Sequence, residues 1–241
     1  MFGLSVQRYV RLSRMKRAAV ALACRPEMPM TEVALAAGFG SSDSFARAFR
    51  EEFGMAPSAF REAPDWAAWQ SAIQPHDQAR KSMTETFDAG DVEIVAFDEV
   101  PVLTMSHRGD PATLNATIGR FIAWRKERRL GPQRTRTFNL FHGDPLGDPA
   151  AFRLDLAGSR PPGVAADEEV EEGFIPGGRC ARLTLAGRGD DLEGPANWLY
   201  REWLPESGET LRDFPLFCKR SNFGPGIPES GMVTQLYLPL A

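Results

Sequence analysis

The chain has 241 residues, 43% of them hydrophobic, which is enough for one large domain or two smaller ones with a sizeable core. No run of about 18 apolar residues occurs and the first residues lack the apolar region of a signal peptide, so we expect a cytoplasmic protein with no membrane partner. The net charge of −4 is unevenly spread: residues 1–62 hold 9 Lys/Arg against 6 Asp/Glu, and residues 63–241 hold 19 against 26. This split favours a nucleic-acid-binding head joined to a body of another kind.

The cysteines and histidines are few and widely spaced. The sequence contains no CxxC pair, and neither residue type clusters with metal-ligand spacing. The residues are Cys24, Cys180, Cys218, His76, His107 and His142. We therefore expect reduced, buried thiols and no metal or other cofactor.

A basic helix is predicted over residues 6–23. Apolar residues at helical spacing give it a packing face, and five basic residues lie between positions 8 and 17. These are Arg8, Arg11, Arg14, Lys16 and Arg17. They form either a solvated face or a surface that contacts DNA phosphates. The helix-turn-helix that is predicted next in the chain favours the second reading, with Arg11 and Arg14 on phosphates.

Residues 31–61 predict two short helices across a glycine turn. Thr31 is a candidate cap for the first helix, and Gly38 supplies the turn. Ser41, Ser42 and Asp43 are candidate caps for the second helix, which Gly54 ends. This is a helix-turn-helix, in which the start of the second helix reaches base edges in the major groove of double-stranded DNA. The expected base contacts are Ser42, Asp43, Ser44 and Arg47.

The order of residues in this stretch resembles the second helix-turn-helix of AraC-type transcription regulators. The likeness is carried by Ala34, Gly38, Phe39, Ser41, Ser44, Phe45, Arg47, Phe49, Arg50, Phe53, Gly54, Pro57, Ser58, Phe60 and Arg61. It implies an all-helical DNA-binding domain over residues 1–62, in which helix 6–23 links two such units. Only residues 2–5 of an earlier unit are present. Either the start is truncated or one unit reads the DNA alone, and the sequence leaves both open.

Residues 63–90 are predicted to form a linker, because Pro64, Pro75 and Gly90 interrupt it and its charges follow no period. Trp66 and Trp69 are three residues apart and fit a last helix packed on the DNA-binding core. From residue 91 the pattern changes to strands alternating with amphipathic helices. Strands are expected at 92–107, 136–142, 151–156, 180–186, 216–221 and 232–238, and helices at 113–129 and 191–203.

An internal repeat relates the two halves of this region. Arg108-Gly109-Asp110 ends a strand and begins a helix, and residues 188–190 repeat the same tripeptide. The strand at 152–156 recurs at 232–236. Two β-α-β-β units related by a pseudo-twofold axis explain this pattern. The fold class is therefore predicted as α+β, with a helical head and a two-repeat body over residues 91–241.

The body resembles the GyrI-like effector-binding domain, the small-molecule sensor of multidrug-responsive regulators. The likeness is carried by FHGDP (141–145), IPGGRCARLTLAGRGDDL (175–192), NWLYREWLPESG (197–208) and TQLYLPL (234–240). It implies a small, amphipathic aromatic effector. Members often carry glutamate in the last strand to hold a cation, and Gln235 stands there in this chain, which puts the preference for cations in doubt.

Strand parity selects the ligand-binding candidates. Leucines on one face of the strands at 152–156 and 232–238 should pack on helices, so the opposite face is left for a ligand. Its residues are Arg153, Asp155, Gln235 and Tyr237, and the expected aromatic or imidazole walls are Phe141, His142, Tyr200 and Trp203. The alternatives are ordinary core positions for the aromatic residues and an ion pair for Arg153 with Asp155.

These features predict a ligand-responsive transcription regulator and not an enzyme. Its expected partners are double-stranded DNA, a small-molecule effector and, as an option, RNA polymerase; the oligomeric state stays open. Two alternatives belong to other classes: a hydrolase that uses Asp155 and Tyr237, and a sequestering protein whose head no longer reads DNA.

Overall fold

The computed structural model describes residues 6–81, 87–132, 134–142, 152–186, 192–221 and 231–241. Contacts divide the chain into a first unit, residues 1–84 with 112–123, and a second unit, residues 85–111 with 124–241. None of the helices in the described ranges is long and apolar enough to span a bilayer. The repeated tripeptide at 188–190 and residues 143–145 of the sensor motif lie outside these ranges.

The first unit contains five consecutive helices. They are α1 (Val6–Cys24), α2 (Met30–Ala36), α3 (Ser42–Phe53), α4 (Pro57–Glu62) and α5 (Trp66–Lys81). The predicted helix-turn-helix is α2 and α3, and the predicted basic helix is α1. The segment expected as a linker contains α5, whose Trp69 and Ile73 are buried with the other helices' apolar residues. The two tryptophans therefore extend the helical core, as their spacing allowed.

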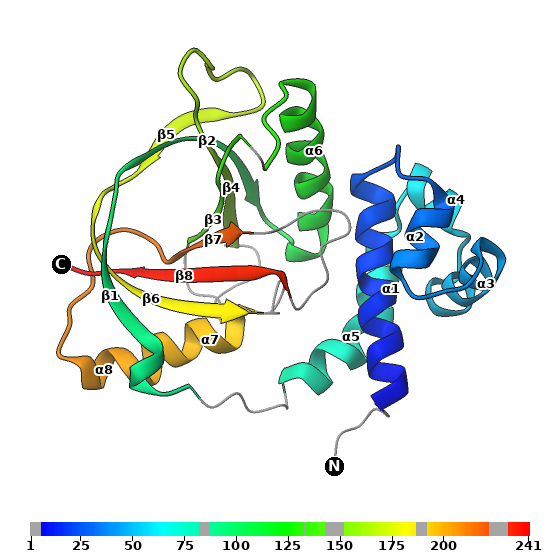
Figure 1. Ribbon diagram of the computed structural model, residues 1–241, viewed down its shortest axis with the longest axis horizontal. Coiled ribbons are helices and arrows are strands. Elements are labelled where there is room, and N and C mark those ends of the chain that lie inside the picture. Colours follow the sequence, from blue (N-terminus) through cyan, green and yellow to red (C-terminus); the bar gives the residue numbers. More distant parts are fainter. Residues whose placement is uncertain (1–5, 82–86, 133, 143–151, 187–191, 222–230) are drawn as a thin grey trace. The chain divides into compact units, whose positions relative to one another are not determined.

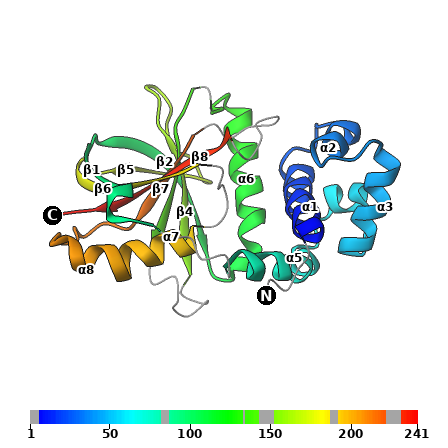
Figure 2. The same cartoon turned by 60° about the horizontal axis from the view of Figure 1, so that its bottom comes forward.

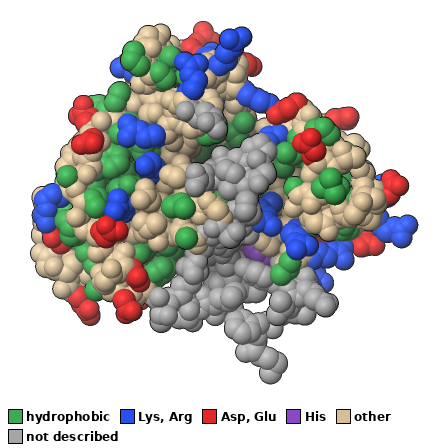
Figure 3. Space-filling view, in the orientation of Figure 1, with side chains coloured by type: hydrophobic (Ala, Val, Ile, Leu, Met, Phe, Trp, Pro, Cys, Tyr) green, Lys and Arg blue, Asp and Glu red, His purple; other side chains and the backbone are tan. Residues whose placement is uncertain are grey.

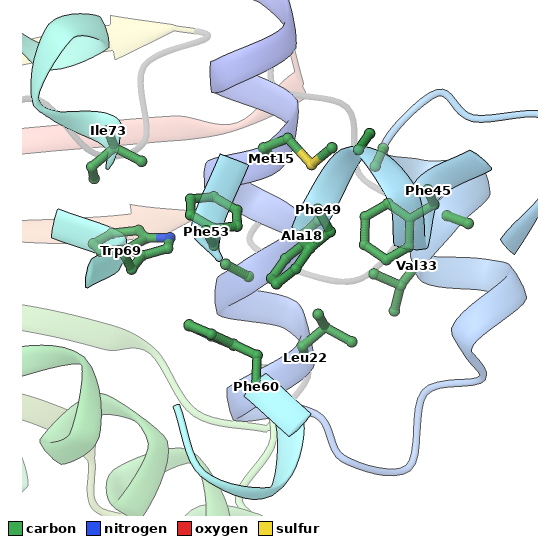
Figure 4. Close-up of a cluster of buried hydrophobic side chains, with 14 residues drawn as sticks. Met15, Ala18, Leu22, Val33, Phe45, Phe49, Phe53, Phe60, Trp69 and Ile73 are labelled. Carbon is green, nitrogen blue, oxygen red and sulfur yellow. The ribbon is translucent and has the colours of Figure 1, made fainter. Parts of the chain in front are cut away.

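Phenylalanines from α3 and α4 form the centre of this core, which Figure 4 shows with Met15 and Leu22 of α1. The ring of Phe49 lies 5.5 Å from Phe45, 4.6 Å from Phe53 and 5.5 Å from Phe60, measured between centroids. All four side chains are at most 5% exposed. Edge-to-face and tilted contacts of this kind add to the burial of apolar area. Burial also raises the pKa of the Cys24 thiol to about 11, so this thiol stays protonated near neutral pH.

The turn between α2 and α3 requires glycine at position 38. Gly38 has φ +79°, a left-handed conformation that disfavours residues with a Cβ atom. A Cβ atom at this position would also lie only 2.5 Å from Nη1 of Arg14. The turn thus brings the backbone close to the basic helix α1. Gly54 adopts φ +72° at the end of α3, where a Cβ atom would meet open space.

We expect Gly38→Ala to lower the free energy of unfolding of the first unit by about 1–2 kcal/mol, because alanine is strained in the left-handed backbone conformation and its Cβ atom would displace Arg14. Gly54→Ala carries the backbone strain alone and should cost less. Gly40→Ala is the matched control, because no atom lies within 4 Å of its Cβ position and its φ is not left-handed. Urea unfolding of the three variants measures the order; equal effects at positions 38 and 40 would contradict the assignment.

The second unit is built on one eight-stranded antiparallel sheet. The strands are β1 (Val92–Phe97), β2 (Val100–Arg108), β3 (Thr137–His142), β4 (Arg153–Ser159), β5 (Glu171–Ile175), β6 (Gly178–Ala186), β7 (Phe217–Ser221) and β8 (Val233–Pro239). Their spatial order is β1-β6-β8-β7-β3-β4-β2-β5. The sheet curls strongly, as Figures 1 and 2 show.

The sheet order confirms the two-repeat architecture and adds one strand to each repeat. Strands β3, β4 and β2 occupy one half and β7, β8 and β6 the other, with β3 and β7 paired at the centre. The segment expected as one strand at 92–107 is two strands, and β5 was not predicted. Each additional strand pairs with the opposite repeat, β1 with β6 and β5 with β2. The predicted β-α-β-β unit is thus corrected to β-β-α-β-β, with its first strand exchanged between halves.

The helices of this region are α6 (Leu114–Glu127), α7 (Glu193–Trp198) and α8 (Leu204–Ser207), with α7 and α8 joined by the π-helical turn η4 (Leu199–Trp203). Short 3-10 turns, η1 (Ala89–Asp91) and η2 (Pro111–Thr113), precede β1 and α6. The predicted helix at 191–203 extends to residue 207, and Gly208 ends it at φ +72°. Contacts assign residues 114–123 of α6 to the first unit and the rest to the second.

The two faces of the sheet have different partners. Leu183, Leu236 and Leu238 pack with Leu199 and Trp203 of the α7-η4 helix, and we call this the helix face. On the opposite side the sheet curls around an inner face whose buried residues include Phe138, Phe217 and Tyr237. The expectation that leucines of the last strand pack on a helix is therefore confirmed. The other side chains of this strand belong to the inner face.

Candidate functional site

The start of α3 presents an exposed polar surface. Ser41 caps the helix by accepting a hydrogen bond from the Ser44 backbone N–H at 3.2 Å, and the Ser44 hydroxyl donates to the Ser41 carbonyl at 2.9 Å. Asp43, Ser44 and Arg47 are exposed and Ser42 is half-buried. The cap thus uses part of the hydrogen-bonding capacity of Ser44. Asp43 and Arg47 are the residues of this group with their side chains turned to solvent and outside the cap.

The two arginines expected on DNA phosphates have different surroundings. Arg11 bonds Glu51 of α3 at 3.0 Å and lies 3.8 Å from Glu52. A phosphate would have to displace the exposed Glu51 and the half-buried Glu52, so Arg11 offers a weaker contact than its charge alone implies. Arg14 is exposed and lies against the Gly38 turn, next to the start of the helix-turn-helix. Of the two, Arg14 is the better placed cation.

Asp155 is the centre of a polar cluster on the inner face of the sheet. Its side chain is 4% exposed and accepts hydrogen bonds from three residues. Ser106 Oγ lies 2.6 Å from Oδ1, His142 Nε2 lies 2.6 Å from Oδ2, and Arg153 donates to Oδ1 at 3.1 Å and to Oδ2 at 2.8 Å. The predicted residues Asp155, Arg153 and His142 are therefore brought together. The alternative of an Arg153–Asp155 ion pair is what the structure contains.

These contacts keep Asp155 ionised. Burial by itself would raise the pKa of the carboxyl group, but the hydrogen bonds from His142, Arg153 and Ser106 outweigh it and hold the pKa well below the usual range of aspartate. The positive charge of Arg153 compensates the carboxylate. Asp155 therefore does not offer an uncompensated negative charge to a ligand.

Tyr237 belongs to an aromatic cluster on the same face. Its ring stacks on Phe217 with 5.0 Å between centroids and an interplanar angle of 6°, and Phe97 lies 5.1 Å away. Its hydroxyl donates to Oε1 of Gln235 at 3.2 Å. Burial raises the pKa of Tyr237, although a hydrogen bond with Arg182 opposes the shift, so the phenol stays neutral near pH 7. Gln235 and Tyr237 are thus placed together, as parity predicted.

The expected aromatic walls lie elsewhere. Phe141, Tyr200 and Trp203 pack on the helix face with Leu236 and Leu238. Burial raises the pKa of Tyr200, and its phenol group forms a hydrogen bond with the backbone of Leu216. Their assignment as walls of a site next to Asp155 is therefore corrected, because β3 directs Phe141 to one face and His142 to the other. These three aromatic residues occupy ordinary core positions, the alternative that the sequence left open.

Sequence reasoning missed the aromatic residues that do line the inner face. Phe97 and Phe217 surround Tyr237, and Phe138 lies 6.3 Å from Phe97. It also missed Ser106 and Lys219. The alternation of the strand at 216–221 could have placed Phe217 and Lys219 on one face. Phe97 could not be found this way, because β1 pairs with a strand of the other repeat.

Comparison with known proteins agrees with both units. Residues 90–241 match the GyrI-like small molecule binding domain, and residues 1–63 match a helix-turn-helix domain of the AraC type. The chain belongs to the GyrI-like family. This chain is 36% identical over 154 residues to the "Probable transcriptional regulator YgiV" of Escherichia coli K12, and the match spans 63% of this chain and 96% of that protein.

Other similarities cover smaller and larger shares of the chain. The "Right origin-binding protein" of Escherichia coli K12 is 34% identical over 67 residues, which is 28% of this chain and 23% of that protein. The structure of an EcmrR–DNA complex matches 88% of this chain and 77% of its own, with a TM-score of 0.52 and 15% identity. The isolated EcmrR C-terminal domain matches 62% of this chain and 96% of its own, with a TM-score of 0.50 and 12% identity. At such identities the likeness shows the fold alone. The predicted AraC-type and GyrI-like recognition and the α+β fold class are confirmed.

Proposed function

We propose that this chain is a ligand-responsive transcription regulator of the cytoplasm. Its helix-turn-helix reads double-stranded DNA, and its GyrI-like unit binds a small molecule that shifts an equilibrium between states with different DNA binding or RNA polymerase contact. The observation that supports this most directly is the presence of a helix-turn-helix with an exposed second helix in the same chain as a GyrI-like small molecule binding domain.

The DNA-reading surface proposed here is the exposed start of α3. Arg47 is exposed, and it forms no ion pair among the residues that the structure describes. An arginine in this state can donate two hydrogen bonds to one guanine edge without first breaking an internal contact. Asp43 lies one helical turn before it and Arg50 lies on the following turn, both exposed. Arg14 supplies a phosphate contact beside the turn.

Arg47→Ala should weaken binding to a specific DNA site by about 1–3 kcal/mol and relax the preference at one base position. Arg47→Lys is the matched control: it keeps the charge and removes the paired donors, so it should lose specificity while it keeps most of the non-specific affinity. Arg14→Ala should instead weaken binding to all DNA sequences alike and reduce the salt dependence of the affinity. Electrophoretic mobility shifts over a salt series measure the three effects. Unchanged specific binding in Arg47→Ala would show that α3 does not read bases.

The hydrolase alternative gains no support from the inner face. Asp155 and Tyr237 lie in the same cross-strand row, but Leu140 and Phe217 stand between them. Asp155 accepts from three donors and Tyr237 is a neutral, raised-pKa phenol. Neither is arranged to activate a shared water. Two relatives, YgiV of Escherichia coli and Rob of Salmonella typhimurium, are named as transcriptional regulators.

A further inference from the structure

The inner face of the sheet carries two cross-strand rows that the pseudo-twofold axis relates. The first, the Asp155 row, runs from β2 to β1 through Ser106, Asp155, Leu140, Phe217, Tyr237, Arg182 and Glu93. The second, the Lys219 row, runs from β5 to β6 through Glu171, Thr104, Ala157, Phe138, Lys219, Gln235 and Thr184. The two rows run in opposite directions across the β3–β7 pair, and differences between equivalent positions show where the two halves have diverged.

The rows differ in charge next to the axis. Asp155 corresponds to Gln235, and its neighbour Leu140 corresponds to Lys219. The one carboxylate near the axis is therefore replaced by an amide in the second row, and an apolar neighbour is replaced by a cation. Arg182, further out in the first row, bonds Glu93 at 2.8 Å. The charges that this face can offer to a ligand near the axis are consequently those of Lys219 and of Arg136, whose guanidinium group lies 5.9 Å from the centroid of the Phe138 ring.

Lys219 stands among apolar and neutral polar side chains. Its cross-strand neighbours are Phe138 and Gln235, and Phe217 precedes it by two residues on the same face of β7. The side chain is half-buried, and it takes part in no ion pair within the described ranges. A half-buried ammonium group without a carboxylate partner gains from an added anion, because the surrounding low dielectric strengthens the attraction.

The aromatic cluster beside Lys219 reaches the surface through Phe97, which is half-buried and whose ring lies 6.3 Å from Phe138 and 4.9 Å from Phe217. Phe138 and Phe217 are fully buried and lie 6.5 Å apart across the axis, and Tyr237 stacks on Phe217. Figure 3 shows hydrophobic side chains gathered on the second unit with Lys and Arg side chains among them. The Gln235 amide accepts the Tyr237 hydroxyl through Oε1, which leaves its N–H groups as donors. Lys219 and Gln235 together thus present donors beside an aromatic surface.

We propose that the effector of this GyrI-like unit is an aromatic or apolar acid whose carboxylate contacts Lys219 and Gln235. The apolar body contacts Phe97, the half-buried ring packed on the buried cluster of Phe138, Phe217 and Tyr237. This inference rests on the proposed function and names its ligand class. A cation is disfavoured because it would meet Lys219, while the negative charge of Asp155 is already compensated by Arg153.

A matched series of three naphthalene probes tests the charge preference in the wild-type chain. The probes are 2-naphthoate, 2-naphthamide and 2-naphthylmethylammonium, which share the ring system and differ in charge. Isothermal titration calorimetry at low salt should give the tightest binding for the carboxylate, about tenfold tighter than for the amide, and the weakest for the ammonium. Raising the salt concentration should reduce the advantage of the carboxylate.

Lys219→Met tests the residue, because it keeps the stem of the side chain and removes the charge. The affinity for 2-naphthoate should fall about tenfold to that of the amide, and the affinity for 2-naphthamide should change little. Lys219→Gln is the second variant, should the methionine disturb the fold, and a thermal melt checks both. Lys126→Met is the control, since Lys126 is exposed on α6 and should leave all three affinities unchanged.

Each contrary result has a defined meaning. Ammonium binding as tight as carboxylate binding, or a carboxylate preference that survives in both Lys219 variants, overturns the inference and leaves the proposed function in place. Absence of binding by all three probes also overturns it, because each carries the aromatic body. The proposed function is tested separately by the DNA binding of Arg47→Ala, which does not depend on any probe.

Discussion

Replacement of Phe49 by alanine should lower the free energy of unfolding of the first unit by about 3–5 kcal/mol, the usual cost of deleting a fully buried phenyl ring. Phe49 is 0% exposed and contacts the rings of Phe45, Phe53 and Phe60. It holds α3 against α4, so its loss should also remove the proposed DNA binding. Figure 4 shows the ring at the centre of the cluster.

Two measurements make this prediction specific. Hydrogen exchange followed by mass spectrometry should show lost protection in peptides from α1 to α5, with the strands of the second unit unchanged. Leu35→Ala is the matched control, because Leu35 lies on α2 of the same unit and is 64% exposed. It should cost within about 0.5 kcal/mol. A Phe49→Ala protein as stable as Leu35→Ala would refute the description of the core.

Asp155→Ala should lower the free energy of unfolding of the second unit by about 2–4 kcal/mol. The substitution leaves Arg153, His142 and Ser106 without their shared acceptor, and removing one member of a buried charged pair costs more than the pair itself contributes. The lower end of the range applies because Arg153 is 34% exposed and can turn to water. Urea unfolding, with hydrogen exchange of β2, β3 and β4, measures the loss.

The effect of Asp155 should depend on pH in a defined direction. The pKa of this group is depressed in the folded state, so its contribution is fully present above the unfolded value of about 4 and is lost as pH falls towards the folded value. The difference between wild type and Asp155→Ala should therefore be constant from pH 5 upwards and shrink below about pH 4. Glu171→Ala, an exposed carboxylate on β5, serves as the control. A difference that grows on acidification would contradict an ionised Asp155.

Much of the fold could be predicted because local patterns and packing agree. The spacing of Phe45, Phe49 and Phe53 determines a helix with one apolar face. Gly38 marks a turn that needs the left-handed backbone conformation, which glycine adopts readily. The repeated strand pattern likewise indicated a pseudo-twofold body. The exchange of β1 and β5 between halves was not predictable, since no local signal tells a strand which repeat it will pair with.

The sequence by itself determined the AraC-type head and the GyrI-like body. It also determined the faces on which Leu236 and Tyr237 lie, because side-chain parity along a strand is a property of the backbone. Only the tertiary structure decided which residues meet across strands. It placed Phe141, Tyr200 and Trp203 in the core between the α7-η4 helix and the sheet, gave Asp155 three donors and left Lys219 beside an aromatic cluster. The physical reason is that the charge available to a ligand depends on neighbours from distant strands, whose register is fixed by pairing of the whole sheet.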